Sequence, residues 1–188
     1  MEYLRDPAEI YRRSFAAVRA ATDLSALAPE LESVAIRLVH ACGEPGIIAQ
    51  LEASPGAVAA GRKALADGAP ILVDAEMVGA GIIRCRLPAN NKVICTLGEA
   101  GVAEAAKGTE TTRSAAAVDL WRSHLAGSVV TIGNAPTALF RLLELIAEGA
   151  AAPAVIRAAR PDLAPLYRGL HRRFHAGARD VREQLPGR

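Results

Sequence analysis

Aromatic side chains and long apolar runs are scarce in this chain of 188 residues. Aromatic residues make up 4% of the sequence and hydrophobic residues 51%, so the core must be packed mainly by Ala, Leu, Val and Ile. No apolar run approaches the ~20 residues that a membrane-spanning helix needs. The opening segment MEYLRDPAEIYRR carries charges from its second residue and lacks the apolar stretch of a signal peptide. These absences predict a cytoplasmic protein with one sizeable folded domain.

Cysteine is also sparse. The three cysteines, Cys42, Cys85 and Cys95, are odd in number and widely separated. This spacing excludes a disulfide framework and lacks the paired cysteines of a zinc site. The chain has no HExxH motif and no Cys/His cluster. We therefore expect reduced thiols, and neither a metal nor another cofactor.

The small net charge of +2 is spread unevenly along the chain. Residues 1–156 hold 14 Lys+Arg against 17 Asp+Glu, whereas residues 157–188 hold 8 Arg against 3 acidic residues. The basic isoelectric point therefore comes from the C-terminal segment, and it gives no reason to expect nucleic-acid binding by the main domain. We expect neither nucleic acid nor a membrane as a partner.

The first third of the chain favours helices. Asp6 followed by Pro7 is a favourable start, because the Asp side chain caps free amides and proline fits the first helical position. Gly43 is a favourable end, since glycine readily adopts the left-handed conformation that terminates helices. The expected helices cover residues 6–21, 28–43 and 54–68.

From residue 70 onward, short apolar runs alternate with helical patterns. The expected strands cover residues 70–73, 82–87, 93–97, 128–132 and 153–156, and the expected helices cover 112–125 and 134–147. This alternation predicts an α/β fold, a three-layer α/β/α arrangement with a mainly parallel central sheet. Ligands of such folds bind at the carboxyl ends of the strands.

Five segments place polar or small residues at the boundaries of these elements. Each has an ordinary structural explanation when taken alone: a lone His40 is usually a hydrogen-bonded core residue, and Asp74 would cap the next helix. The turn at Gly133 is not a GxGxxG motif, and the serines lack a GxSxG motif, so nucleotide binding and a serine triad are poorly supported. The segments are Arg12–Phe15, Val39–Gly43, Asp74–Met77, Thr112–Ala117 and Gly133–Phe140.

Together, in this order, these segments resemble the precorrin-8X methylmutase family over roughly residues 3–156. The resemblance includes GAPILVD at 68–74, LPANNKVICTL at 87–97, TRSAAA at 112–117 and AGSVVTIGNAPTALF at 126–140. It implies an isomerase of cobalamin (corrin) biosynthesis that needs no cofactor. The enzyme would move a methyl group from C11 to C12 of a tetrapyrrole, converting precorrin-8X to hydrogenobyrinate or the cobalt form to cobyrinate. It also implies a homodimer.

The resemblance further implies that His40 donates a proton to the macrocycle. Protonation eases a methyl shift around a conjugated ring, and an imidazole is suited to the task because its ordinary pKa is about 6.5. A helix that ends near Gly43 would favour the charged imidazolium.

The remaining site residues are expected to hold the carboxylates of the substrate. Arg13 and Arg113 match family positions, and a guanidinium is suited to binding carboxylates. Arg84 and Arg86 are further candidates, although a solvated surface is an equally good explanation for them. The other expected substrate-binding residues are Ser14, Ser114, Asn134 and Thr137, the last two at a helix N-terminus whose amides bind anions, and Glu76, which would orient a neighbour.

Residues 157–188 depart from the family pattern, in which a further Gly- and Pro-containing strand follows. We expect this Arg-rich segment to be a separate tail that truncates or replaces the C-terminal part of the fold. A frameshift is one explanation; a natural divergent tail is the other. A natural tail would form an amphipathic helix through Leu163, Leu166, Tyr167, Leu170 and Phe174, with His171 and His175 at its surface.

Two other functions remain open from the sequence. Truncation would allow a non-catalytic protein that binds or carries a corrinoid. An unrelated α/β nucleotide-binding module is the third possibility, and the missing phosphate loop argues against it.

Overall fold

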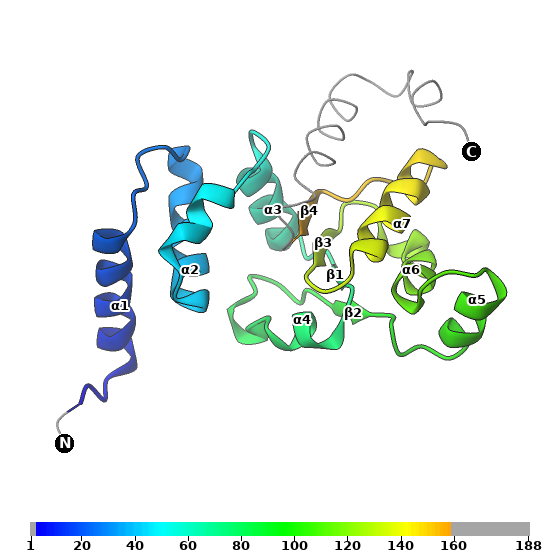
Figure 1. Cartoon of the computed structure of the whole chain (residues 1–188), viewed down its shortest axis with the longest axis horizontal. Coiled ribbons are helices and arrows are strands. Elements are labelled where there is room, and N and C mark those ends of the chain that lie inside the picture. The colour runs from blue at the N-terminus through cyan, green and yellow to red at the C-terminus, as the bar shows by residue number, and fades with distance from the viewer. Residues whose placement is uncertain (1–2, 159–188) are drawn as a thin grey trace. The chain divides into compact units, whose positions relative to one another are not determined.

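The computed structural model describes residues 3–158, so the helix and the histidines expected in the C-terminal tail lie outside the described residues. The chain divides into two compact units, Met1–Ala53 and Ser54–Arg188 (Figure 1). We describe each unit by itself.

Unit 1 is built on two helices, α1 and α2, which pack against each other. Its core consists of Ala35, Val39 and Ile48, with Val18 and Leu24 packed beside them. Two 3-10 helices, η1 and η2, flank α2. The bounds are Pro7–Ala21 for α1, Pro29–Leu31 for η1, Glu32–Cys42 for α2 and Pro45–Gln50 for η2.

The ends of these helices agree with the sequence analysis. The Asp6 side chain accepts a hydrogen bond of 3.1 Å from the amide of Ala8, and Pro7 opens α1. α2 ends at Gly43, whose φ of 72° lies in the left-handed region that glycine adopts without steric cost. The Gly43 amide closes the helix by donating to the carbonyl of Val39 at 2.7 Å. Both predicted helices are confirmed.

Thr22, directly after α1, carries a buried hydroxyl that has no hydrogen-bond partner within residues 3–158. Burying an unpaired polar group is costly, and the extended backbone of Thr22 suits a β-branched residue. We expect Thr22→Val to stabilise the protein by about 1 kcal/mol, measured by urea unfolding. Thr22→Ser is the control: it keeps the hydroxyl and loses the methyl group, so it should destabilise. A destabilising Thr22→Val would show that the hydroxyl is satisfied.

Unit 2 contains a four-stranded, all-parallel sheet in the order β2-β1-β3-β4. The register places Leu72 opposite both Ile94 and Val130, and Val130 opposite Ile156. The predicted α/β fold is confirmed. The bounds are Ile71–Val73 for β1, Val93–Cys95 for β2, Val129–Ile132 for β3 and Val155–Ala158 for β4.

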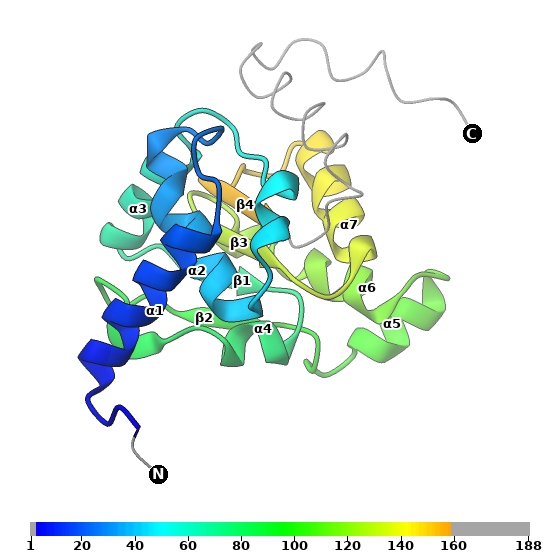
Figure 2. The same ribbon diagram turned by 60° about the vertical axis from the view of Figure 1, so that its left-hand side comes forward.

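Helices cover both faces of this sheet, and α3 and α7 lie on opposite sides of β3 and β4 (Figure 2). On the α3/α4 face, two glycines allow close packing. A Cβ built on Gly61 of α3 would lie 3.4 Å from Val155, and one on Gly79 of α4 would lie 3.4 Å from Val73. The bounds are Ala57–Ala66 for α3, Glu76–Ala80 for α4, Val102–Gly108 for α5, Arg113–Asp119 for α6 and Pro136–Ala147 for α7.

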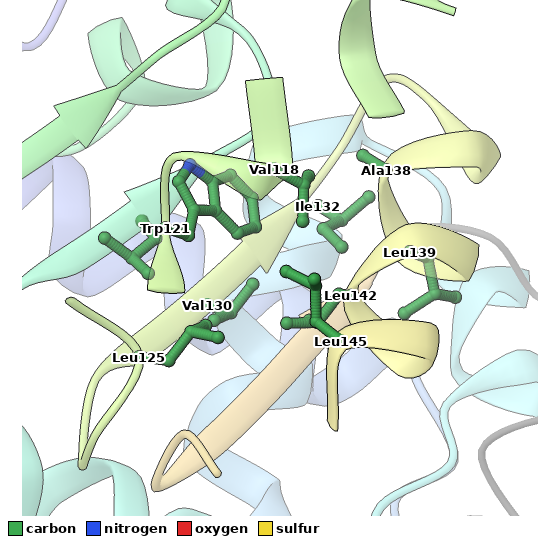
Figure 3. Packing of buried hydrophobic residues seen from close by; sticks show 10 residues of the cluster. Val118, Trp121, Leu125, Val130, Ile132, Ala138, Leu139, Leu142 and Leu145 are labelled. Atoms are coloured by element: carbon green, nitrogen blue, oxygen red, sulfur yellow. The ribbon is translucent and has the colours of Figure 1, made fainter. Parts of the chain in front are cut away.

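The main core lies on the opposite face, between the sheet and helices α6 and α7 (Figure 3). Trp121 is fully buried there, and its indole N–H donates to the Thr96 hydroxyl at 2.9 Å. That hydroxyl donates in turn to the carbonyl of Ala117 at 2.7 Å, so the polar atoms at this position are satisfied. The other buried members are Leu72, Val118, Leu125, Val130, Ile132, Ala138, Leu139, Leu142 and Leu145.

The strand predicted over residues 82–87 is wrong. This segment forms a 3-10 helix, η3 (Arg84–Arg86), and Ile83 beside it is 51% exposed. It belongs to the crossover that carries the chain from the end of β1 back to the start of β2, because these neighbouring strands are parallel. Its alternating side chains resemble a strand pattern, but the crossover gives them no sheet face to cover.

Two further differences concern helices. α5 was not predicted, since its seven residues are too few to show a helical period. The helix expected over 112–125 ends at Asp119 and continues as a 3-10 turn, η4 (Arg122–His124).

No helix within residues 3–158 has the length and apolar character needed to cross a membrane.

Candidate active site

In unit 1, His40 lies in the last turn of α2 and is exposed. Its Nδ1 is 2.7 Å from the hydroxyl of Ser14 on α1, so the packing of the two helices sets the direction of the ring. Within residues 3–158, Nε2 makes no hydrogen bond. The imidazole is thus anchored through one nitrogen, and the other is available to a ligand.

Two aromatic rings of α1 also contact His40. The centroid of the Tyr11 ring lies 5.4 Å from the imidazole centroid, and the Phe15 ring lies 5.1 Å away, nearly perpendicular to it. The Arg37 guanidinium stands 5.5 Å from the Phe15 centroid. Sequence analysis did not predict that Tyr11, Phe15 and Arg37 lie around His40. The available signal was their spacing, since Tyr11 and Phe15 are four residues apart on α1 and Arg37 precedes His40 by three residues on α2.

Arg13 lies on the surface of α1, next to Ser14 in the sequence, and is engaged within the helix. Its Nε pairs with Glu9 at 2.5 Å, and Arg12 pairs with the same carboxylate. The hydrogen bonds from Arg13 and then Arg12 hold the pKa of Glu9 below its ordinary value. Arg13 is therefore shared with an internal acid, and its role in substrate binding stays a prediction.

In unit 2, Asp74 follows β1 at the carboxyl end of the sheet and is 3% exposed. Its carboxylate accepts three backbone hydrogen bonds from the turn after β3, from Gly133 at 2.9 Å, Asn134 at 2.9 Å and Ala135 at 2.7 Å. The Asp74 carboxylate thus occupies the position at the N-terminus of α7 where an anionic ligand would otherwise bind.

This arrangement changes one part of the sequence-based hypothesis. The amides of residues 133–135 already have an acceptor, so they are not free to bind a substrate carboxylate. The assignment of Asn134 and Thr137 to substrate binding through other atoms stays a prediction. Gly133 is required for close packing, since a Cβ there would lie 2.7 Å from a methyl group of Val78.

The N-termini of α6 and α7 are linked by two hydroxyls, Thr112 and Thr137, 2.8 Å apart. Thr112 also caps α6 by accepting from the amide of Ala115 at 3.1 Å. Beside it, the exposed Arg113 donates a long hydrogen bond of 3.3 Å to the carbonyl of Leu97, after β2. The structure therefore brings Thr137 and the segment carrying Arg113 and Ser114 together at the carboxyl ends of the strands.

Glu76 is the first residue of α4, and its carboxylate influences the thiol of Cys95, the last residue of β2. Burial raises the pKa of the Cys95 thiol, and the hydrogen bond and negative charge of Glu76 act in the same direction.

Arg84 and Arg86 lie on η3 and are exposed. No cluster of three or more His, Cys, Asp or Glu side chains suited to a metal occurs in the described part of the chain.

Comparison with known proteins gives the class of this enzyme, an isomerase of cobalamin biosynthesis. The sequence model of Precorrin-8X methylmutase matches residues 9–160. The chain therefore belongs to the precorrin-8X methylmutase family, as the resemblance predicted.

Individual relatives agree with this assignment. The chain is 55% identical over 156 residues to a precorrin-8X methylmutase of Pseudomonas aeruginosa, covering 83% of this chain and 75% of the relative. It is 54% identical over 155 residues to one from a Sinorhizobium species, covering 82% and 74%. Among solved structures, the precorrin-8X methylmutase of Thermus thermophilus superimposes with a TM-score of 0.73 at 35% identity, covering 87% of this chain and 81% of that one.

Proposed function

We propose that this protein moves the methyl group of precorrin-8X from C11 to C12, with His40 as the general acid. The single observation that carries the proposal is the anchored imidazole: Nδ1 bonds to Ser14 at 2.7 Å, while Nε2 has no hydrogen-bond partner within residues 3–158. In the imidazolium form, Nδ1–H donates to the serine hydroxyl and Nε2–H is the proton for transfer.

The proton balance of the reaction suits a single acid. Nε2 gives its proton to the conjugated ring, the methyl group migrates with its bonding electrons, and the ring then loses a proton. Substrate and product are isomers, so no proton is consumed overall. His40 ends neutral with its Nδ1–H still on Ser14, and it regains a proton for the next turnover.

The test is to mix purified protein with precorrin-8X and follow the absorbance of the corrin product. Turnover would support the isomerase. Binding of hydrogenobyrinate without any turnover of precorrin-8X would instead support the non-catalytic corrinoid-binding protein. The same assay with the cobalt form distinguishes the two substrates.

Arg113 is proposed to bind a carboxylate of the ring. Its only hydrogen bond within the described residues is long and exposed, so truncation should leave stability within about 0.5 kcal/mol. We expect Arg113→Ala to weaken hydrogenobyrinate binding roughly 10- to 100-fold, because a hydrogen bond to a charged group contributes about 1.5–3 kcal/mol. Spectroscopic titration measures the dissociation constant. Arg113→Lys should lose less, and an unchanged constant in Arg113→Ala would contradict the assignment.

The other expectations remain part of this proposal. We propose Ser14, Ser114, Asn134, Thr137, Arg13 and Glu76 as substrate-binding or orienting residues, a homodimer as the assembly and the cytoplasm as the location. We also propose a tail distinct from the main domain; the family match, which ends at residue 160, supports a boundary close to the expected 156, although β4 runs to Ala158.

A further inference from the structure

Arg141 of α7 binds carboxylates from two helices at once. Its guanidinium lies 2.8 Å from Asp119, the last residue of α6, and 2.9 Å and 2.8 Å from Glu144 and Glu148 at the end of α7. Glu148 also pairs with Arg122, so the network joins α6, η4 and α7. An isolated exposed ion pair contributes little, whereas several carboxylates around one guanidinium form a network of defined geometry.

The apolar face of α6 offers few side chains that interlock with α7. Its buried residues, at positions 115–118, are three alanines and a valine. Helices are held in register by side-chain ridges that fit into grooves, and alanine methyl groups form only low ridges. Polar contacts at the two ends of α6 therefore set its place along α7. These contacts are the hydroxyls of Thr112 and Thr137, 2.8 Å apart, and the pair of Asp119 with Arg141.

We propose that Arg141 is a positioning residue for substrate binding: it holds Asp119, and through α6 it sets the place of Arg113. This inference rests on the proposed function, in which Arg113 binds a carboxylate of the ring. Arg141 itself does not touch the substrate in this scheme. Its effect on binding comes from the orientation of a second arginine, because a guanidinium binds a carboxylate well only in a defined geometry.

The geometry of α6 connects the two arginines. Arg113 and Asp119 are its first and last residues, about 9 Å apart along the axis, and backbone hydrogen bonds keep this separation constant. The Thr96 hydroxyl holds the carbonyl of Ala117 at 2.7 Å and fixes α6 toward the sheet. Within the described residues, the Arg113 side chain makes only its 3.3 Å hydrogen bond to the carbonyl of Leu97. The place of Arg113 therefore depends on the helix that carries it.

The test compares two carboxylates that bind the same guanidinium. Asp119→Ala and Glu144→Ala each remove one acidic partner of Arg141, but only Asp119 belongs to α6. We expect Arg141→Met and Asp119→Ala to weaken hydrogenobyrinate binding about 5- to 10-fold, and Glu144→Ala to change it less than about twofold. Spectroscopic titration measures the dissociation constants, and urea unfolding establishes that each variant is folded.

A second background shows whether the effect passes through Arg113. Arg141→Met is combined with Arg113→Ala, and the four proteins of this cycle are titrated in parallel. We expect Arg141→Met to change the dissociation constant less than about twofold once Arg113 is absent, because the group that it positions is gone. In the ligand-free protein, the amide NMR signals of Arg113 and Ser114 should move in Asp119→Ala and stay in place in Glu144→Ala.

The outcomes separate this inference from the proposed function. Equal weakening by Arg141→Met with and without Arg113 would overturn it, because Arg141 would then support the fold alone. Equal effects of Asp119→Ala and Glu144→Ala, or unchanged binding in Arg141→Met, would overturn it as well. Failure of the wild-type protein to turn over precorrin-8X would count against the isomerase alone, since the titrations report binding and not chemistry.

Discussion

Replacing His40 with alanine is expected to abolish isomerisation while leaving corrin binding largely intact. The imidazole is exposed at the end of α2 and is held by Ser14. We therefore expect its removal to affect the rate of the reaction more than the stability of the protein. Loss of a general acid typically costs about 10²- to 10⁴-fold in rate. The measurement is the rate of product absorbance at saturating precorrin-8X, with binding of hydrogenobyrinate determined in parallel.

Two variants sharpen this test. His40→Gln keeps a polar side chain of similar length but has no acidic proton, so it should be as inactive as the alanine variant. Ser14→Ala keeps the imidazole and removes its anchor at Nδ1, so it should retain part of the rate. Full turnover in His40→Ala would remove this residue from the mechanism.

The second large effect is expected on stability, from Asp74→Ala. The buried carboxylate accepts hydrogen bonds from three consecutive amides, and its removal leaves all three without their acceptor. Each unpaired buried group costs about 1–3 kcal/mol, and partial hydration of the gap reduces the sum, so we expect a loss of roughly 3–5 kcal/mol. Urea unfolding followed by tryptophan fluorescence measures this directly, because Trp121 is fully buried in the same unit.

Asp67→Ala is the matched control for this prediction. Asp67 is an exposed aspartate that pairs with Lys63 at 2.7 Å in the same unit, and exposed ion pairs contribute little. Its loss should change stability by no more than about 0.5 kcal/mol. Asp74→Asn retains one acceptor oxygen and should fall between the two. If Asp74→Ala and Asp67→Ala behave alike, the three amides must be satisfied in another way.

Local patterns predicted much of this fold. The short apolar runs at β1 and β3 are bounded by turn residues, and the caps at Asp6 and Gly43 are set by neighbours in the sequence. The strand prediction for residues 82–87 failed because a sequence pattern reports only which side chains are apolar. Whether they find a sheet to cover depends on strands elsewhere in the chain.

The candidate site was predicted only in part, for the same reason. His40 and Arg113 were singled out through the resemblance, and their roles stay predictions. The hydrogen bond that the Gly133 amide donates to Asp74 joins residues 59 positions apart, and no local period in the sequence reports such a contact. Likewise, Tyr11 and Phe15 meet His40 because α1 packs on α2, which a one-dimensional pattern does not contain.

The strand order β2-β1-β3-β4 has a consequence for where a ligand can enter. The chain leaves β1 toward β2 and leaves β3 toward β4, so the two connections run in opposite directions from neighbouring strands, and the carboxyl ends of β1 and β3 are where folds of this class usually bind ligands. Asp74, directly after β1, accepts a hydrogen bond from the turn after β3 and so ties the ends of these two strands together. The close approach of Gly133 to Val78 leaves no room for a side chain at position 133. The three amides at this position already have an acidic partner, so an anionic ligand bound beside them has to be held by other donors.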